Sequence, residues 1–223
     1  MTLSDAILFP RALLPLHIFE PRYRRMLADS LRTHRTFAVA MQKPGRSREI
    51  PSAIGSLGLI RAAVTLKDGT SHIILQGLAR VQLEELVRYK PYRLQKIRYL
   101  ETVGSDTPAA DALTAEVMEL VVEWFRQGVD LPPNMISQMS QLLGGSDQPQ
   151  AKMEPLSTKQ ILEVLTRLEN PESLADLVSW TLLPDPIHRQ TILETFDLEE
   201  RLRYLVHFLS EEIRLGRKHH KKG

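Results

Sequence analysis

The residues able to do acid–base or metal chemistry are scattered along this sequence. Its seven histidines, at positions 17, 34, 72, 188, 207, 219 and 220, include no pair at the i, i+4 spacing of a zinc-protease helix. Adjacent acids such as Glu84-Glu85 and Glu211-Glu212 lie in strand-edge or amphipathic contexts, and adjacent side chains on a helix point about 100° apart. We therefore interpret them as solvated surface, and we predict neither a metal site nor a catalytic carboxylate pair.

Motifs for nucleotide hydrolysis and nucleophilic catalysis are also absent. None of the 11 glycines is followed by the lysine that a phosphate-binding loop requires. The order of Gly55-Ser56-Leu57-Gly58 does not fit the G-x-S-x-G elbow, and the chain has no cysteine. A dispersed Ser-His-Asp triad stays open as an alternative, because its members meet only in the fold. The sequence thus predicts no enzyme and no cofactor, with a small-molecule enzyme of unrecognised type as a third possibility.

The composition is that of an ordinary soluble globular protein. The 223 residues include 29 Lys and Arg against 27 Asp and Glu, and 43% are hydrophobic, which excludes a disordered or collagen-like chain. This length favours one or two domains. No run of 18 apolar residues and no signal peptide is evident. Together with the lack of cysteine, these features predict a cytoplasmic protein that does not enter a membrane.

Charge is distributed unevenly. Residues 1–101 carry 17 basic and 8 acidic side chains, residues 102–213 carry 7 basic and 19 acidic ones, and the last ten carry five basic and no acidic ones. This asymmetry indicates two regions with different surfaces, which contact each other or face different partners. Ordinary solvation of two surfaces is the simpler alternative.

The basic part has the pattern of short strands. Stretches rich in aliphatic and aromatic residues lie at 7–9, 13–16, 36–41, 57–66, 71–86 and 92–100. Asp68-Gly69 predicts a two-residue hairpin turn, because this dipeptide favours positive φ, and Gly77 predicts a bulge or a close backbone approach. One helix is predicted to begin at Pro21, with an apolar face of Tyr23, Met26, Leu27 and Leu31.

From Thr107 onward the hydrophobic period changes from 2 to about 3.6 residues. Capping signals predict helices that begin after Thr107, Ser157, Asn170, Asp185 and Asp197. The last helix carries a continuous apolar stripe, which consists of Leu198, Leu202, Leu205, Leu209 and Ile213. This half is therefore predicted to be a helical bundle.

Segments along nearly the whole chain resemble the N-terminal domain of the ATP-dependent Lon proteases. In this chain, Phe9-Pro10 and Leu14–Tyr23 (LPLHIFEPRY) resemble the opening signature of that domain. Its central hairpin and the following strand resemble Gln76–Val81, QGLARV, and Pro91-Tyr92. Its closing helices resemble 174–178, LADLV, and 194–202, ETFDLEERL.

The resemblance implies an α+β fold. A twisted β-rich, PUA-like pseudo-barrel with one helix would occupy residues 1–103, a helical bundle 104–215 and a basic disordered tail 216–223. In the full-length proteases this domain helps to recognise unfolded or tagged proteins, and ATPase and Ser-Lys peptidase domains follow it. The resemblance implies a non-catalytic module for unfolded or hydrophobic protein segments, working alone or as an adaptor in ATP-dependent proteolysis. Its partners would be such segments, a protease or further copies of itself.

Two surfaces are candidates for this binding. The first lies beside the predicted hairpin and first helix and includes the tyrosines Tyr23, Tyr89, Tyr92 and Tyr99. The second is a short helix after Pro132-Pro133 with the apolar residues Met135, Ile136 and Met139, whose flexible thioethers suit varied partners. Packing of that helix into the core is the favoured alternative.

Nucleic-acid binding by the basic part is a rival function. Cations would contact phosphates while tyrosines stack on bases. The candidate cations are Arg22, Arg24, Arg25, Arg46, Arg48, Arg61, Arg80, Arg88, Lys90, Arg93, Lys96 and Arg98. The acidic second part would repel phosphate, so we prefer protein binding.

Overall fold

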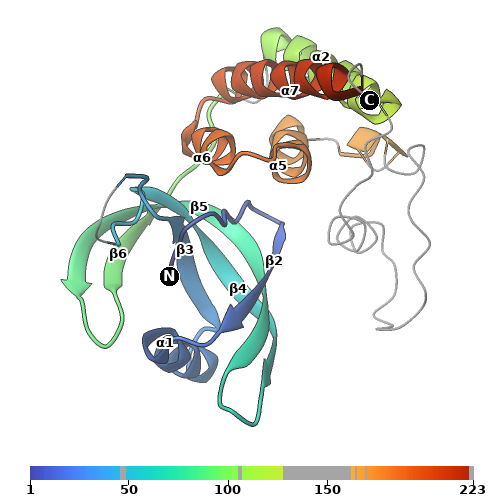
Figure 1. The fold of residues 1–223 in the computed structure, drawn as a ribbon. Coiled ribbons are helices and arrows are strands. Elements are labelled where there is room, and N and C mark those ends of the chain that lie inside the picture. Colours follow the sequence, from blue (N-terminus) through green and yellow to red (C-terminus); the bar gives the residue numbers. More distant parts are fainter. Residues whose placement is uncertain (46–48, 105–106, 128–161, 164, 169, 221–223) are drawn as a thin grey trace. The chain divides into compact units, whose positions relative to one another are not determined.

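The computed structural model describes residues 1–45, 49–104, 107–127, 162–163, 165–168 and 170–220 (Figure 1). Two compact units are formed, one by Met1–Glu101 with Asp185–Phe196 and the other by Thr102–Pro184 with Asp197–Gly223. The first contains a sheet with helix α1, and the C-terminal part of the chain is helical, which confirms the α+β class. The domain limits expected from the resemblance stay predictions, because compact packing alone does not define an independently folding domain.

Six strands form the sheet of the first unit. Its strand order is β1-β3-β4-β5-β2, and β6 pairs with β5. The strands are β1 (Thr2–Leu3), β2 (Leu13–Ile18), β3 (Thr36–Met41), β4 (Ile54–Thr65), β5 (Ser71–Arg88) and β6 (Leu94–Tyr99). β1 runs parallel to β3, and the other neighbours are antiparallel. Residues 7–9, predicted as a strand, are not one. They are fully buried, so their apolar character reflects burial and not strand pairing.

The hairpin between β4 and β5 is confirmed, but its loop is longer than predicted. The Gly69 amide donates to the Leu66 carbonyl over 2.9 Å, and the Leu66 amide donates to the Thr70 carbonyl over 2.8 Å. Within this loop only Gly69 has a positive φ, of 79°. The Asp68 carboxylate accepts a hydrogen bond from the Thr70 amide at 2.9 Å. The result is a three-residue loop closed by one left-handed glycine, a common alternative to the two-residue turn.

Both predictions for Gly77 are confirmed. Gly77 faces Gly58 and Ala79 faces Leu57, which leaves Leu78 as an extra residue in β5 and makes a bulge. The amide of Gly77 donates to the Ala12 carbonyl at 2.9 Å, and its carbonyl accepts the Arg11 amide at 2.8 Å. The segment before β2 therefore lies directly against the backbone of β5.

Helix α1 (Pro21–Arg32) begins at the predicted proline and packs its predicted face onto the sheet (Figure 1). Tyr23, Met26 and Leu27 are buried in one cluster with strand residues, and Leu31 packs at its edge. The strand side of this core consists of Ile18, Phe37, Val39, Ile60, Ile73 and Leu75.

Helix α6 (Pro186–Glu194) also belongs to the first unit, although the sequence placed it in the bundle. The Gln190 amide group donates to the Ile54 carbonyl at 3.1 Å, and the buried Arg80 donates to the Leu193 carbonyl at 3.2 Å. These polar contacts join α6 to β4 and β5. Hydrophobic periodicity does not reveal such partners, because it reports only that a helix has a buried face.

The second unit contains α2 (Pro108–Arg126), α5 (Pro171–Leu182) and α7 (Leu198–His220). Their predicted N-caps are confirmed: Thr107 accepts the Ala110 amide, Asn170 the Glu172 amide and Asp197 the Glu200 amide, at 2.8–3.1 Å. α7 continues to His220, where the sequence predicted a disordered tail from residue 216. Of the helix predicted after Ser157, residues 162–163 and 165–168 are described; 162–163 and 165–166 are helical, and Leu165 is buried. Among those described, no helix is long and apolar enough to cross a membrane.

Candidate protein-binding surfaces

Three of the four predicted tyrosines meet at one hollow of about 190 Å³, which we call the tyrosine hollow. Tyr23 reaches it from α1, and Tyr89 and Tyr92 from the connection between β5 and β6. Met1, Thr2, Arg22, Met26, Glu49, Lys90, Pro91 and Arg93 complete the lining. Tyr99, an exposed residue of β6, does not line it. Met135, Ile136 and Met139 lie outside the described residues.

The floor of the hollow is a closed polar network. The Tyr23 hydroxyl accepts the Thr2 amide at 3.1 Å and lies 3.1 Å from Glu49 Oε1. Burial raises the pKa of Tyr23. Burial also opposes ionisation of Glu49, but hydrogen bonds from Arg22, Thr2 and Tyr23 outweigh it and lower the pKa of Glu49. Arg22 additionally pairs with Glu20 at 2.8 Å, so this network fixes the entry into α1.

The rim of the hollow is basic and aromatic. The Arg93 guanidinium lies 5.2 Å from the Tyr89 ring centroid, and that of Arg88 lies 5.7 Å from the Tyr92 centroid. The Tyr92 hydroxyl donates to Asp29 at 3.0 Å. Burial and this carboxylate raise the pKa of Tyr92, so the phenol stays neutral near pH 7. Lys90 completes the rim.

A second surface, not predicted, is the solvent side of β2, β5 and β4. His17, His72 and Val64 face one another across these strands, and so do Pro15, Ile74 and Ala62. All six are exposed, and Phe19 follows beside His17 with 60% of its surface accessible. We call these seven residues the outer face. It contains no Asp, Glu, Lys or Arg, and its two imidazoles stack with ring centroids 4.7 Å apart.

The outer face could not be predicted from the sequence, because β2 and β5 carry apolar residues on both sides of the sheet. Leu14, Leu16 and Ile18 point to the core, yet Pro15 and Phe19 are apolar too. Alternation therefore does not reveal which side meets water. The only local signal was a histidine at the same level of each strand, His17 and His72.

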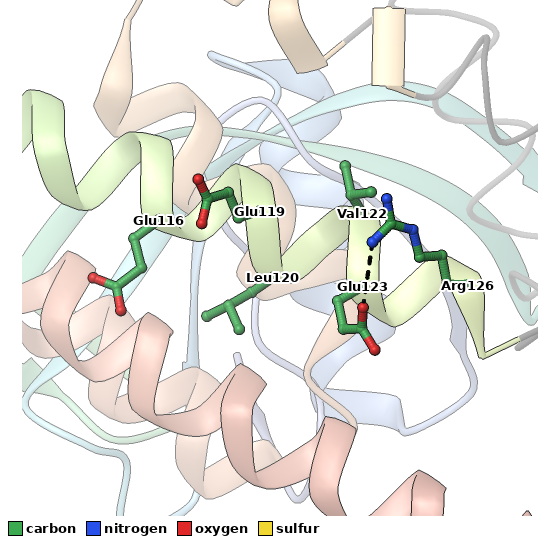
Figure 2. Close-up of a pocket in the computed structure, with 6 residues that line it drawn as sticks. All are labelled: Glu116, Glu119, Leu120, Val122, Glu123 and Arg126. Atoms are coloured by element: carbon green, nitrogen blue, oxygen red, sulfur yellow. Dashed lines mark ion pairs between the residues drawn. The ribbon is translucent and has the colours of Figure 1, made fainter.

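Another hollow, of about 530 Å³, runs along α2 in the second unit (Figure 2). Its described lining consists of Glu116, Glu119, Leu120, Val122, Glu123 and Arg126. Glu123 and Arg126 form an ion pair at 3.6 Å, and the side chains of Glu116 and Glu119 point away from this ion pair (Figure 2). The described residues of this hollow offer acidic and apolar contacts. Across the described part of the chain, no three His, Cys, Asp or Glu residues gather as metal ligands.

Ion pairing reduces the cations that nucleic acid would need. Arg22 pairs with Glu20, Arg25 with Asp29, Lys96 with Glu85 and Arg98 with Glu84, and Arg80 is buried. A phosphate would have to compete with these carboxylates for each paired side chain. Nucleic-acid binding stays a prediction, and fewer cations are available for phosphate contacts than the sequence alone indicated.

Comparison with known proteins adds to this geometry. The family model of the ATP-dependent protease La (LON) substrate-binding domain matches residues 1–211. A Lon protease of Dictyoglomus thermophilum is 24% identical over 218 residues, which make up 96% of this chain and 24% of that protein. A Lon protease of Koribacter versatilis is 27% identical with the same coverage. The chain thus spans about a quarter of the length of these relatives.

Solved structures show the same fold. The N-terminal domain of a Mycobacterium avium complex Lon protease superimposes with a TM-score of 0.65 at 18% identity, covering 94% of this chain and 96% of that one. A Lon N-terminal domain protein from Xanthomonas campestris gives a TM-score of 0.60 at 18% identity, with coverage of 93% and 95%.

Proposed function

We propose, because this chain belongs to the ATP-dependent protease La (LON) substrate-binding domain family, that it is a non-catalytic module that binds unfolded or hydrophobic protein segments. It would hold such segments by itself or as an adaptor for a separate ATP-dependent protease. The family name supports protein binding in general, and the surfaces of this chain suggest the chemistry of what is bound.

The outer face is the observation that carries this proposal. Phe19, Val64 and Ile74 expose apolar side chains around the stacked imidazoles of His17 and His72, on a face without Asp, Glu, Lys or Arg. Contiguous exposed apolar surface of this kind marks binding sites more often than ordinary protein surface. An unfolded segment offers apolar side chains in any order, and burying them on the face releases water without requiring a specific sequence.

Replacing Val64 and Ile74 together by threonine is expected to weaken binding of an uncharged apolar peptide about tenfold. The changes V64T and I74T keep the β-branched shape that strands favour, so they remove apolar contact while preserving the sheet. The probe is a fluorescein-labelled 12-residue peptide of Phe, Leu, Ser, Gln and Gly, and the measurement is fluorescence anisotropy.

The matched control is V103T in the second unit, because Val103 is as exposed as Val64, at 64% against 61%. This control should bind the peptide as tightly as the unchanged protein. Equal affinity of the V64T/I74T protein and the control would remove the outer face from the proposal. No binding by the unchanged protein would contradict the proposed function itself.

A further inference from the structure

We infer that the hairpin tip, Leu86–Leu94, and the tyrosine hollow beside it bind protein segments in which carboxylates alternate with apolar residues. This inference rests on the proposed function, because it names a class of substrate for a second surface of the same module. It concerns different residues from the outer face, so the two can be tested separately.

Unpaired positive charge is the first observation. The tip contains Arg88, Lys90 and Arg93 and no Asp or Glu. None of the three forms an ion pair with any described residue. Further along the same hairpin, Lys96 pairs with Glu85 at 2.7 Å and Arg98 with Glu84 at 3.0 Å. The arms of the hairpin are thus neutralised by their own acids, while the tip keeps three cations for an outside partner.

Exposed apolar surface is the second observation. Val87 and Tyr89 expose 55% and 57% of their surface, and Leu86 and Leu94 are exposed as well. Hydration alone stabilises the lysine and arginines of the tip. Its exposed apolar side chains, in contrast, are stabilised when a partner removes them from water. A partner that satisfies both features has apolar and acidic side chains close together.

The hollow shows how a carboxylate would be held. Glu49 is its only described carboxylate, and the hydrogen bonds of the floor already engage it. Arg93 is held in place by its bond to the Glu49 carbonyl at 3.2 Å and by the Tyr89 ring. An incoming carboxylate at the rim would therefore meet a positioned guanidinium and the Lys90 ammonium, with little ordering of Arg93 required.

The charge complementarity favours a protein segment over a nucleic acid. Phosphate binding gains from many cations along a groove, whereas this tip has three cations, with Tyr89, Pro91 and Tyr92 between them and exposed aliphatic residues on either side. Alternation of charged and apolar side chains over a short stretch is what an extended acidic-apolar peptide can match.

The test compares two 12-residue fluorescent peptides that differ only in charge. In the first, Glu alternates with Leu and Phe, and in the second, Gln replaces each Glu. We expect the unchanged protein to bind the acidic peptide about tenfold more tightly at low salt, and this preference to fall as NaCl rises to 0.5 M. The tip variant R88Q/K90Q should lose most of the preference. Arg93 is left intact because it supports the fold through Glu49.

The matched control is K96Q/R98Q, which removes the same charge from the paired arms of the same hairpin. It should keep the preference within about twofold. Equal affinity for both peptides in the unchanged protein, or an equal loss in the two variants, would overturn the inference. So would complete displacement of the acidic peptide by poly(U) RNA or by phosphatidylserine vesicles at lower concentration than unlabelled peptide. Binding of the Gln peptide without preference would leave the proposed function standing, and binding of neither peptide would contradict both.

Discussion

Replacing Arg201 by alanine is expected to lower the free energy of unfolding by about 3–5 kcal/mol. Arg201 of α7 has 0% of its surface exposed. Its guanidinium lies 3.5 Å from Glu172 and 3.8 Å from Asp176, both on α5, and 3.2 Å from the Thr102 hydroxyl. Asp176 is buried as well. Alanine would leave a cavity and would remove a buried cation from beside Asp176 and Glu172, and each of these changes is costly.

The measurement is urea unfolding followed by tryptophan fluorescence. Trp124 and Trp180 lie on α2 and α5, so the signal reports the unit that contains Arg201. Arg203→Ala is the control, because it removes an arginine from the same helix that is exposed and pairs with Glu199 at 2.8 Å. Its midpoint should be nearly unchanged. Equal midpoints for the two variants would mean that the buried network does not stabilise the unit.

The Arg201 network also shows what a sequence can and cannot indicate. The segment 194–202 resembles the Lon family, and the spacing of Asp197 and Glu200 predicted a helix start there. The partners of Arg201 come from residues 102, 172 and 176. No rule of spacing joins these positions, because they meet only when α5 and α7 pack together.

Local signals explain which elements were predicted correctly. Thr107, Asn170 and Asp197 cap helices through bonds to amides two or three residues away, so the sequence contains both partners. Residues 7–9 contain no such signal. An apolar run can be buried without strand pairing, and its composition alone does not separate the two cases.

The grouping of the tyrosines was predicted in part for the same reason, while their role in binding stays a prediction. Tyr23, Tyr89 and Tyr92 were chosen as aromatic residues near the first helix, and they line one hollow. That choice did not distinguish them from Tyr99, which lies elsewhere on β6. Pairing of Lys96 with Glu85, which separates the neutral arms from the charged tip, depends on strand register. Register is set by the whole sheet and not by the hairpin sequence alone.

Replacing Gly77 by alanine is expected to destabilise the sheet unit by about 3 kcal/mol. A Cβ atom at this position would overlap the carbonyl oxygen of Phe9 and lie 2.8 Å from its carbonyl carbon and 3.2 Å from the Pro10 Cα. These are backbone atoms, and two hydrogen bonds between Gly77 and residues 11 and 12 hold the segment in place. The segment would have to move away from β5, and the buried side chains of residues 7–9 would move with it.

Gly216→Ala is the matched control for this prediction. Gly216 lies in α7, where a Cβ would meet the end of the Gln127 side chain, which can rotate away with loss of one hydrogen bond to the Ile213 carbonyl. Alanine also favours the helix by up to about 1 kcal/mol, so this variant should be neutral or stabilised. Hydrogen exchange of β5 amides separates the outcomes, because both tryptophans lie in the other unit. Faster exchange in Gly77→Ala alone is expected. Unchanged exchange would mean that the segment before β2 can move away from β5 without loss of stability. Gly77 would then have a role other than close packing.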